Sequence, residues 1–168
     1  VSCSPPLMQL CAERGVKIAF LSEYGKFWSR VEGPVSGNVL LRREQYRWAD
    51  NAEKSAEIAR AVVIAKIANQ RTVLQRSLRD HPEITGDMEL RDTIDYLDRQ
   101  LTTLRNPLPL ESVRGVEGDA ARRYFAVFDH LIVADKDAFF FRERNRRPPL
   151  DNMNALLSFL YTLLVHDV

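Results

Sequence analysis

The feature that most constrains the fold is a long amphipathic pattern that runs from Val39 to about Arg79. Apolar or small side chains recur in it every three or four residues, which is the spacing of one face of a helix. These side chains belong to Ala52, Ala56, Ala59, Val63, Ile67, Val73, Leu74 and Leu78. The pattern predicts one long helix with a buried side and a solvated side.

Three later segments carry the same helical spacing. The segment 81–86 contains Pro and Gly and interrupts the first pattern, and a second helix is expected over 88–104. A third helix is expected over about 110–133 and a fourth from 151 to the end. The bulk of the chain is therefore predicted to be all-α, with the first two helices as an antiparallel pair.

The amino-terminal part follows a different pattern. Residues 5–14 are expected to form a short helix, and residues 16–21 and 26–32 are β-branched and aromatic runs that predict a hairpin turning at Gly25. Two strands alone are only marginally stable. We therefore expect further strands upstream of Val1.

A change of composition divides these two parts. Residues 33–38, GPVSGN, hold two glycines and a proline and are predicted to be a linker. Residues 1–32 are then expected to be the carboxyl-terminal part of a β domain, and residues 39–168 an incomplete α-helical catalytic domain. The predicted fold class is mainly α, with a helical domain preceded by a β-hairpin remnant of an amino-terminal β domain.

Composition excludes several classes of protein. The 24 Lys and Arg side chains face 23 Asp and Glu side chains, so the net charge of +1 does not by itself indicate a polyanionic partner. Cys3 and Cys11 match neither a redox pair nor a zinc knuckle. No apolar stretch reaches the roughly 18 residues of a membrane-spanning helix, and no signal peptide is recognisable. We therefore expect a cytoplasmic protein with no membrane partner.

Glu117 is the candidate site residue of the third predicted helix. Gly115 and Gly118 bracket it, and each glycine costs a helix on the order of 1 kcal/mol relative to alanine. Glycines at these positions would let a ligand approach the backbone closely. Arg114 lies on the same helical face, so the alternative is a solvated ion pair between Glu117 and Arg114.

A basic run, RERNRR at 142–147, supplies four arginines against one glutamate. Pro148 and Pro149 follow it, so these cations are not expected to lie along a regular salt-bridged helix. Phosphate contact is one interpretation of the run, and a solvated loop is the other.

Other reactive patterns have little support. The three histidines lack zinc-ligand spacing, the serines lie in no nucleophile elbow, and GPVSGN lacks the Lys-Ser/Thr of a phosphate loop. Acyl-transfer hydrolases and phosphate-loop nucleotide-binding proteins are thereby disfavoured.

Two segments, GVEGDAARRYF at 115–125 and NRRPPLDNMNALLSFLYTLL at 145–164, resemble signature stretches of the CRISPR spacer-acquisition integrase family. Residues 1–47 also resemble that family's passage from its β domain through a linker into its helical domain. The likeness therefore covers nearly the whole chain.

The resemblance implies a metal-dependent DNA endonuclease and integrase that inserts new spacers into a CRISPR array by attack of a DNA 3′-hydroxyl on a phosphodiester. The implied site binds Mg²⁺ or Mn²⁺ through a Glu, a His and an Asp, and Glu117 matches the Glu. The His and the Asp are expected beyond Val168, because His166 and Asp167 come too early to match. The 168 residues alone are therefore expected to be inactive.

Further residues receive roles from the same resemblance. Because duplex DNA needs its phosphates neutralised, a set of arginines is expected to bind DNA. The set is Arg142, Arg144, Arg146, Arg147, Arg122 and Arg123. Asn154 and Arg114 could contact and orient the metal-binding groups. For Asn154 the alternatives are an exposed amide or a hydrogen bond at the start of the last helix.

The expected partners are DNA, a second copy of the chain in a homodimer, and a small CRISPR-associated adaptation protein. Without the resemblance, the alternative function is a non-enzymatic helical module that binds DNA or another protein.

Overall fold

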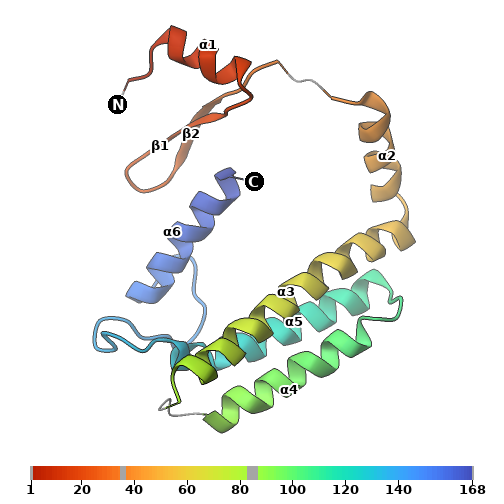
Figure 1. Cartoon of the computed structure of the whole chain (residues 1–168), viewed down its shortest axis with the longest axis vertical. Coiled ribbons are helices and arrows are strands. Elements are labelled where there is room, and N and C mark those ends of the chain that lie inside the picture. Colours follow the sequence, from red (N-terminus) through yellow and green to blue (C-terminus); the bar gives the residue numbers. More distant parts are fainter. Residues whose placement is uncertain (1, 35–36, 83–86, 168) are drawn as a thin grey trace. The chain divides into compact units, whose positions relative to one another are not determined.

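A computed structural model describes residues 2–34, 37–82 and 87–167 of the chain. In this part the chain is mainly helical, with a two-stranded antiparallel hairpin near its beginning (Figure 1). The predicted fold class is therefore confirmed. The chain divides into two compact units, Val1–Leu41 with Arg146–Val168, and Arg42–Asn145. The predicted division into a β domain, a linker and a catalytic helical domain stays a prediction.

The second unit is built on three helices that lie side by side, α3 (Ala52–Asp80), α4 (Asp87–Thr103) and α5 (Leu110–Ala126) (Figure 1). Each helix turns a stripe of apolar side chains toward a shared core. The largest fully buried core side chains are Ile67, Leu74, Leu90, Leu97, Leu104 and Val113. Burial of each large aliphatic side chain contributes roughly 1.5–3 kcal/mol, so the core fixes which face of each helix meets solvent.

The prediction of one helix from Val39 to Arg79 is wrong, because the chain forms α2 (Val39–Ala49) and then α3. Asn51 between them has extended backbone angles, φ −99° and ψ 114°, and its side chain accepts a hydrogen bond from the Lys54 amide at 2.9 Å. An asparagine in this geometry is a helix N-cap, which starts a new helix. Val73 also departs from the predicted stripe, since it is 46% exposed.

The third helix is shorter than predicted. α5 ends at Ala126, and a short 3-10 helix, Phe128–Leu131, follows where the helix was expected to continue to Val133. The ring of Phe141 packs against Phe128 at 4.9 Å between centroids, and the Phe141 amide donates to Asp129 Oδ1 at 2.7 Å. These contacts stabilise a chain that turns back, which a continuing helix could not do.

The first unit contains α1 (Pro5–Glu13), β1 (Ile18–Leu21), β2 (Phe27–Val31) and α6 (Asn152–Asp167). The strands pair antiparallel, with Ile18 opposite Val31. Gly25 at the turn has φ +74°, a conformation that side chains with a Cβ rarely adopt. The hairpin predicted around Gly25 is therefore present.

The beginning of the predicted linker packs closely against α1. A Cβ on Gly33 would lie 2.6 Å from the carbonyl oxygen of Ala12, so only glycine fits there. The linker prediction at 35–36 falls outside the described residues. Among the described helices, none is long and apolar enough to cross a membrane.

Candidate functional site

Glu117 lies on α5 between two buried residues of the same helix, Val113 and Ala120, each 1% exposed. Its Oε1 accepts a hydrogen bond from the Nζ of Lys66 on α3, and the two side chains form an ion pair. The Glu117 side chain is nevertheless 37% exposed. The carboxylate is therefore held by a neighbouring helix and is still reachable from solvent.

Arg114 pairs with Glu111 and Glu117 pairs with Lys66, so the alternative of an ion pair between Glu117 and Arg114 is wrong. The Nη1 of Arg114 lies 2.9 Å from Oε1 of Glu111, one turn nearer the start of α5. Side chains three residues apart on a helix are neighbours, and Arg114 has such a carboxylate on each side. The cation that meets Glu117 comes instead from α3. The proposed role of Arg114 behind a metal site stays a prediction.

The glycines beside Glu117 have open space around them. A Cβ built on Gly115 or on Gly118 would meet no atom within 4 Å among the described residues. Packing in this part of the chain therefore does not require glycine at either position, although each glycine weakens the helix. The open surface that they leave next to the carboxylate is what the approach of a large ligand needs.

A second polar cluster joins α4 to the same stretch of α5. The hydroxyl of Tyr96 donates to Oδ2 of Asp119, and Arg122 donates to Oδ1. The hydrogen bond from Tyr96, and then that from Arg122, holds the pKa of the Asp119 carboxyl below its usual value. Burial, and then the bond to Asp119, raises the pKa of the Tyr96 hydroxyl. This cluster ties α4 to α5 within two residues of Glu117.

The cluster also engages both arginines that were predicted to bind DNA from α5. Arg122 pairs with Asp119, and the guanidinium of Arg123 lies 3.9 Å from the centre of the Tyr96 ring. The Arg122 side chain remains 71% exposed and that of Arg123 45% exposed. A role in DNA binding stays a prediction for both.

The arginines of the basic run differ in their surroundings. The guanidinium of Arg142 lies 5.4 Å from the centre of the Phe140 ring, and Nη1 of Arg144 donates to the Asn145 carbonyl at 2.7 Å. Arg146 and Arg147 are exposed. The boundary between the two compact units falls within this run, after Asn145. DNA binding by these residues stays a prediction.

Asn154 is fully buried near the start of α6. Its backbone N–H donates to Oδ1 of Asp151 at 2.7 Å, and its side-chain Nδ2 donates to Oδ2 of the same residue at 2.8 Å. The alternative of an exposed amide is therefore wrong, and the alternative of a hydrogen bond at the helix start is present in the structure. Support of a metal site by Asn154 stays a prediction.

Glu117 fits the role of one ligand to a hard divalent cation, because it offers a carboxylate oxygen on an open surface. Across residues 2–34, 37–82 and 87–167, no group of three or more His, Cys, Asp or Glu side chains is placed to hold a metal ion. The side chains of His166 and Asp167 lie outside the described part. The fold and the site thus define a mainly helical protein with a partly exposed carboxylate, that of Glu117, beside an open helix surface.

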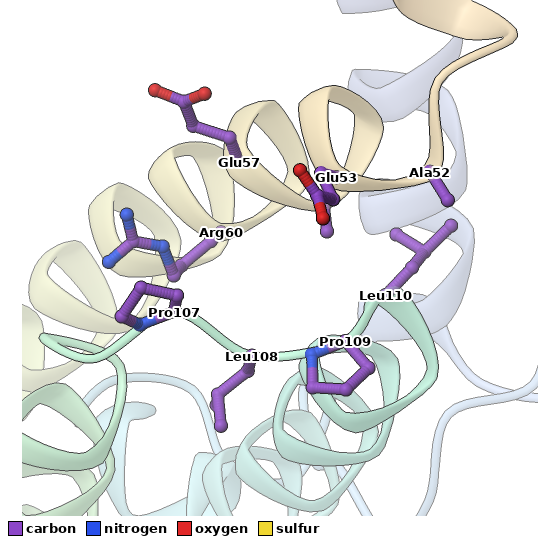
Figure 2. Close-up of a pocket in the computed structure, with 9 residues that line it drawn as sticks. Ala52, Glu53, Glu57, Arg60, Pro107, Leu108, Pro109 and Leu110 are labelled. Atoms are coloured by element: carbon purple, nitrogen blue, oxygen red, sulfur yellow. The ribbon is translucent and has the colours of Figure 1, made fainter.

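Two features of this unit were not found from the sequence. One is the pairing of Lys66 with Glu117, which no local pattern signals. The other is a pocket of about 660 Å³ between the first turns of α3 and the loop that leads into α5 (Figure 2). Arg60, which lines the pocket, donates from Nη1 to the carbonyl oxygens of Leu104 and Arg105, at 3.0 and 3.1 Å. The lining residues are Ala52, Glu53, Ala56, Glu57, Arg60, Pro107, Leu108, Pro109 and Leu110.

Comparison with known proteins identifies the family. The family described as CRISPR associated protein Cas1 matches residues 1–168. A CRISPR-associated endonuclease Cas1 of Chlorobaculum tepidum is 51% identical over 168 residues, which are 100% of this chain and 49% of that protein. A second, from Rhodospirillum rubrum, is 48% identical, with 98% of this chain and 48% of that protein covered. The chain belongs to the Cas1 family.

A solved structure agrees with this membership. A chain of a Cas6-RT-Cas1–Cas2 complex superposes with a TM-score of 0.67 at 27% identity, with 97% of this chain and 17% of that chain covered. The chain spans about half the length of the curated relatives it matches. The family resemblance stated from residues 115–125 and 145–164 is confirmed.

Proposed function

We propose that the full-length protein is a divalent-metal-dependent DNA endonuclease and integrase that inserts new spacers into a CRISPR array. Membership of the Cas1 family supports the proposal, since relatives that are about half identical to this chain are named endonucleases. One observation links the proposed activity to a residue. The carboxylate of Glu117 is partly exposed and lies between two glycines that have open space around them.

The proposed reaction exchanges one phosphodiester bond for another. The oxygen of a DNA 3′-hydroxyl forms a bond to phosphorus and loses its proton, while the bond to the leaving 3′-oxygen breaks and that oxygen is protonated. Attack by water in place of the hydroxyl gives strand cleavage. A bound Mg²⁺ or Mn²⁺ would stabilise the negative charge that develops on these oxygens.

The residues of this chain would serve the reaction by binding and positioning. Glu117 would supply one negatively charged oxygen ligand, and the core residues on either side of it would keep it in place. Exposed arginines, with Arg146 and Arg147 foremost, would neutralise DNA phosphates. We further propose that the protein acts with a Cas2-like partner, because the matched complex contains Cas2. The homodimer that the family resemblance implies is part of the same proposal.

The proposal is tested by exchanging carboxylates on one helix. Glu117→Gln in the full-length protein should abolish metal-dependent strand transfer of a labelled 3′-end into array DNA. Glu111→Gln is the matched control, because Glu111 lies on the same helix and is also paired with a cation. It should retain most activity. Circular dichroism should show both variants folded. Full activity of Glu117→Gln would remove Glu117 from the site, whereas no strand transfer by the unaltered full-length protein would favour the non-enzymatic helical module.

A further inference from the structure

The ion pair between Lys66 and Glu117 differs from most ion pairs on this surface. Pairs such as Lys54 with Glu57 join residues one turn apart on a single helix. Lys66 and Glu117 are 51 residues apart and join α3 to α5. Lys66 precedes Ile67, which is 0% exposed, so the core fixes the backbone of α3 at the point from which the Lys66 side chain reaches Glu117.

The ammonium of Lys66 contacts the carboxylate that would serve as a metal ligand. It binds Oε1 of Glu117, and in the described part of the chain no other cation contacts this carboxylate. A divalent cation at the same carboxylate would carry charge of the same sign as the ammonium. The two cations therefore repel each other, and each weakens the hold of the carboxylate on the other.

We infer that Lys66 is a further residue of the Glu117 site, a built-in competitor that holds the carboxylate in the metal-free protein and lowers its affinity for a divalent cation. The inference rests on the proposed metal-dependent function. Because the pair is partly exposed, the competition is modest. An ion pair of this kind corresponds to about a two- to fivefold change in an equilibrium constant.

The test measures Mn²⁺ binding to the full-length protein by titration calorimetry in the absence of DNA. Lys66→Met removes the charge and keeps a long side chain that suits a helix. It should tighten Mn²⁺ binding about two- to fivefold, whereas Lys66→Arg should leave the affinity near that of the unaltered protein. Lys54→Met is the matched control, because it makes the same charge change on the same helix, and its affinity should not rise.

The outcomes separate this inference from the proposed function. Glu117→Gln should remove the Mn²⁺ site, and unchanged Mn²⁺ binding in that variant would overturn the proposed function itself. If Glu117→Gln removes the site but Lys66→Met binds Mn²⁺ as the unaltered protein does, Lys66 is an ordinary surface partner. Weaker binding by Lys66→Met would mean that Lys66 orients the carboxylate for the metal. Either of the last two results overturns the inference that Lys66 competes with the divalent cation for Glu117.

Discussion

The hydroxyl of Tyr96 on α4 donates a hydrogen bond to Oδ2 of Asp119 on α5, and this bond joins the two helices close to Glu117. Arg123 reinforces it, since its guanidinium lies over the Tyr96 ring and its Nε is 3.7 Å from the same carboxylate oxygen. Hydrogen bonds to an ionised acceptor are stronger than those between neutral groups. The charge on Asp119 therefore matters for the packing of α4 on α5.

The first prediction concerns pH and Asp119. Its pKa in the folded chain lies below the ordinary value of 3.8 because Tyr96 and Arg122 donate to the carboxylate. The ionised Asp119 carboxylate therefore stabilises the folded chain fully at pH values well above 3.8. This stabilisation is lost as the pH falls through the lower pKa of the folded chain. Asp119→Asn should lower the urea midpoint at pH 7, and the difference from the unaltered protein should shrink below pH 3.8.

The matched control for this prediction is Asp137→Asn, which removes the same charge from an exposed position. It should shift the urea midpoint little at either pH. A difference between Asp119→Asn and the unaltered protein that is the same at every pH would show that the carboxylate charge is not what holds the two helices.

The second prediction concerns the core of the helical unit. Ile67 is 0% exposed, so Ile67→Ala should lower the free energy of unfolding by about 2–5 kcal/mol through lost burial and the cavity left behind. Ile58 lies on the same helix and is 50% exposed, and Ile58→Ala should change the free energy of unfolding by only about 0.5 kcal/mol. Urea unfolding followed by circular dichroism measures both, and equal losses would contradict this placement of the core.

The helices could be predicted because their periodicity is local. The stripe that includes Val63, Ile67 and Leu74 is legible from spacing alone, and all three residues are in the core. Two ends were missed for physical reasons. The side chain of Asn51 caps α3, a choice that competes with simple continuation of the helix. The end of α5 depends on Phe141, fifteen residues beyond Ala126, and no local pattern contains that contact.

The candidate site could be predicted only in part. Glu117 can be identified from the sequence because it lies in a segment that resembles a family motif and because glycines flank it. Both signals lie within a few consecutive residues. The spacing offers Arg114, a neighbour on the same helix, as the partner in the alternative ion pair, whereas in the structure the partner of Glu117 is Lys66. Spacing along one helix says which residues share a face, but it does not say which residue of another helix meets that face. That register is set by the packing of α3 on α5.

The third prediction concerns salt and the basic run. Arg146 and Arg147 are exposed, whereas Arg144 already donates to a backbone carbonyl, so the first two are the better candidates for phosphate contact. Each phosphate contact contributes about 0.9 to the slope of log affinity against log salt, so replacing both with Ala should flatten the slope by up to about 1.8. Fluorescence anisotropy with branched DNA measures it in the full-length protein.

The control for the salt experiment replaces Arg76 and Arg79, which both pair with Asp80 at 3.1 and 3.0 Å. This double variant removes the same charge from the protein as a whole. Its salt slope should stay close to that of the unaltered protein. Equal flattening by both double variants would show that net charge, and not contact by the basic run, sets the affinity.

The last prediction is that the 168 residues alone do not catalyse strand transfer. A lone carboxylate binds Mg²⁺ or Mn²⁺ weakly, and these ions keep most of their water unless several ligands converge. In the described residues Glu117 has no second and third ligand beside it. Phosphodiester oxygens would then not be held in line for the exchange of bonds.

The measurement incubates the purified 168-residue chain with branched DNA and Mn²⁺, beside the full-length protein and its Glu117→Gln variant. Only the unaltered full-length protein should give metal-dependent strand transfer, and the other two should match the background without metal. Comparable turnover by the 168-residue chain would mean that its own side chains complete the site. The first residues to replace in that case would be His166 and Asp167, because they are the histidine and aspartate nearest the end of the chain.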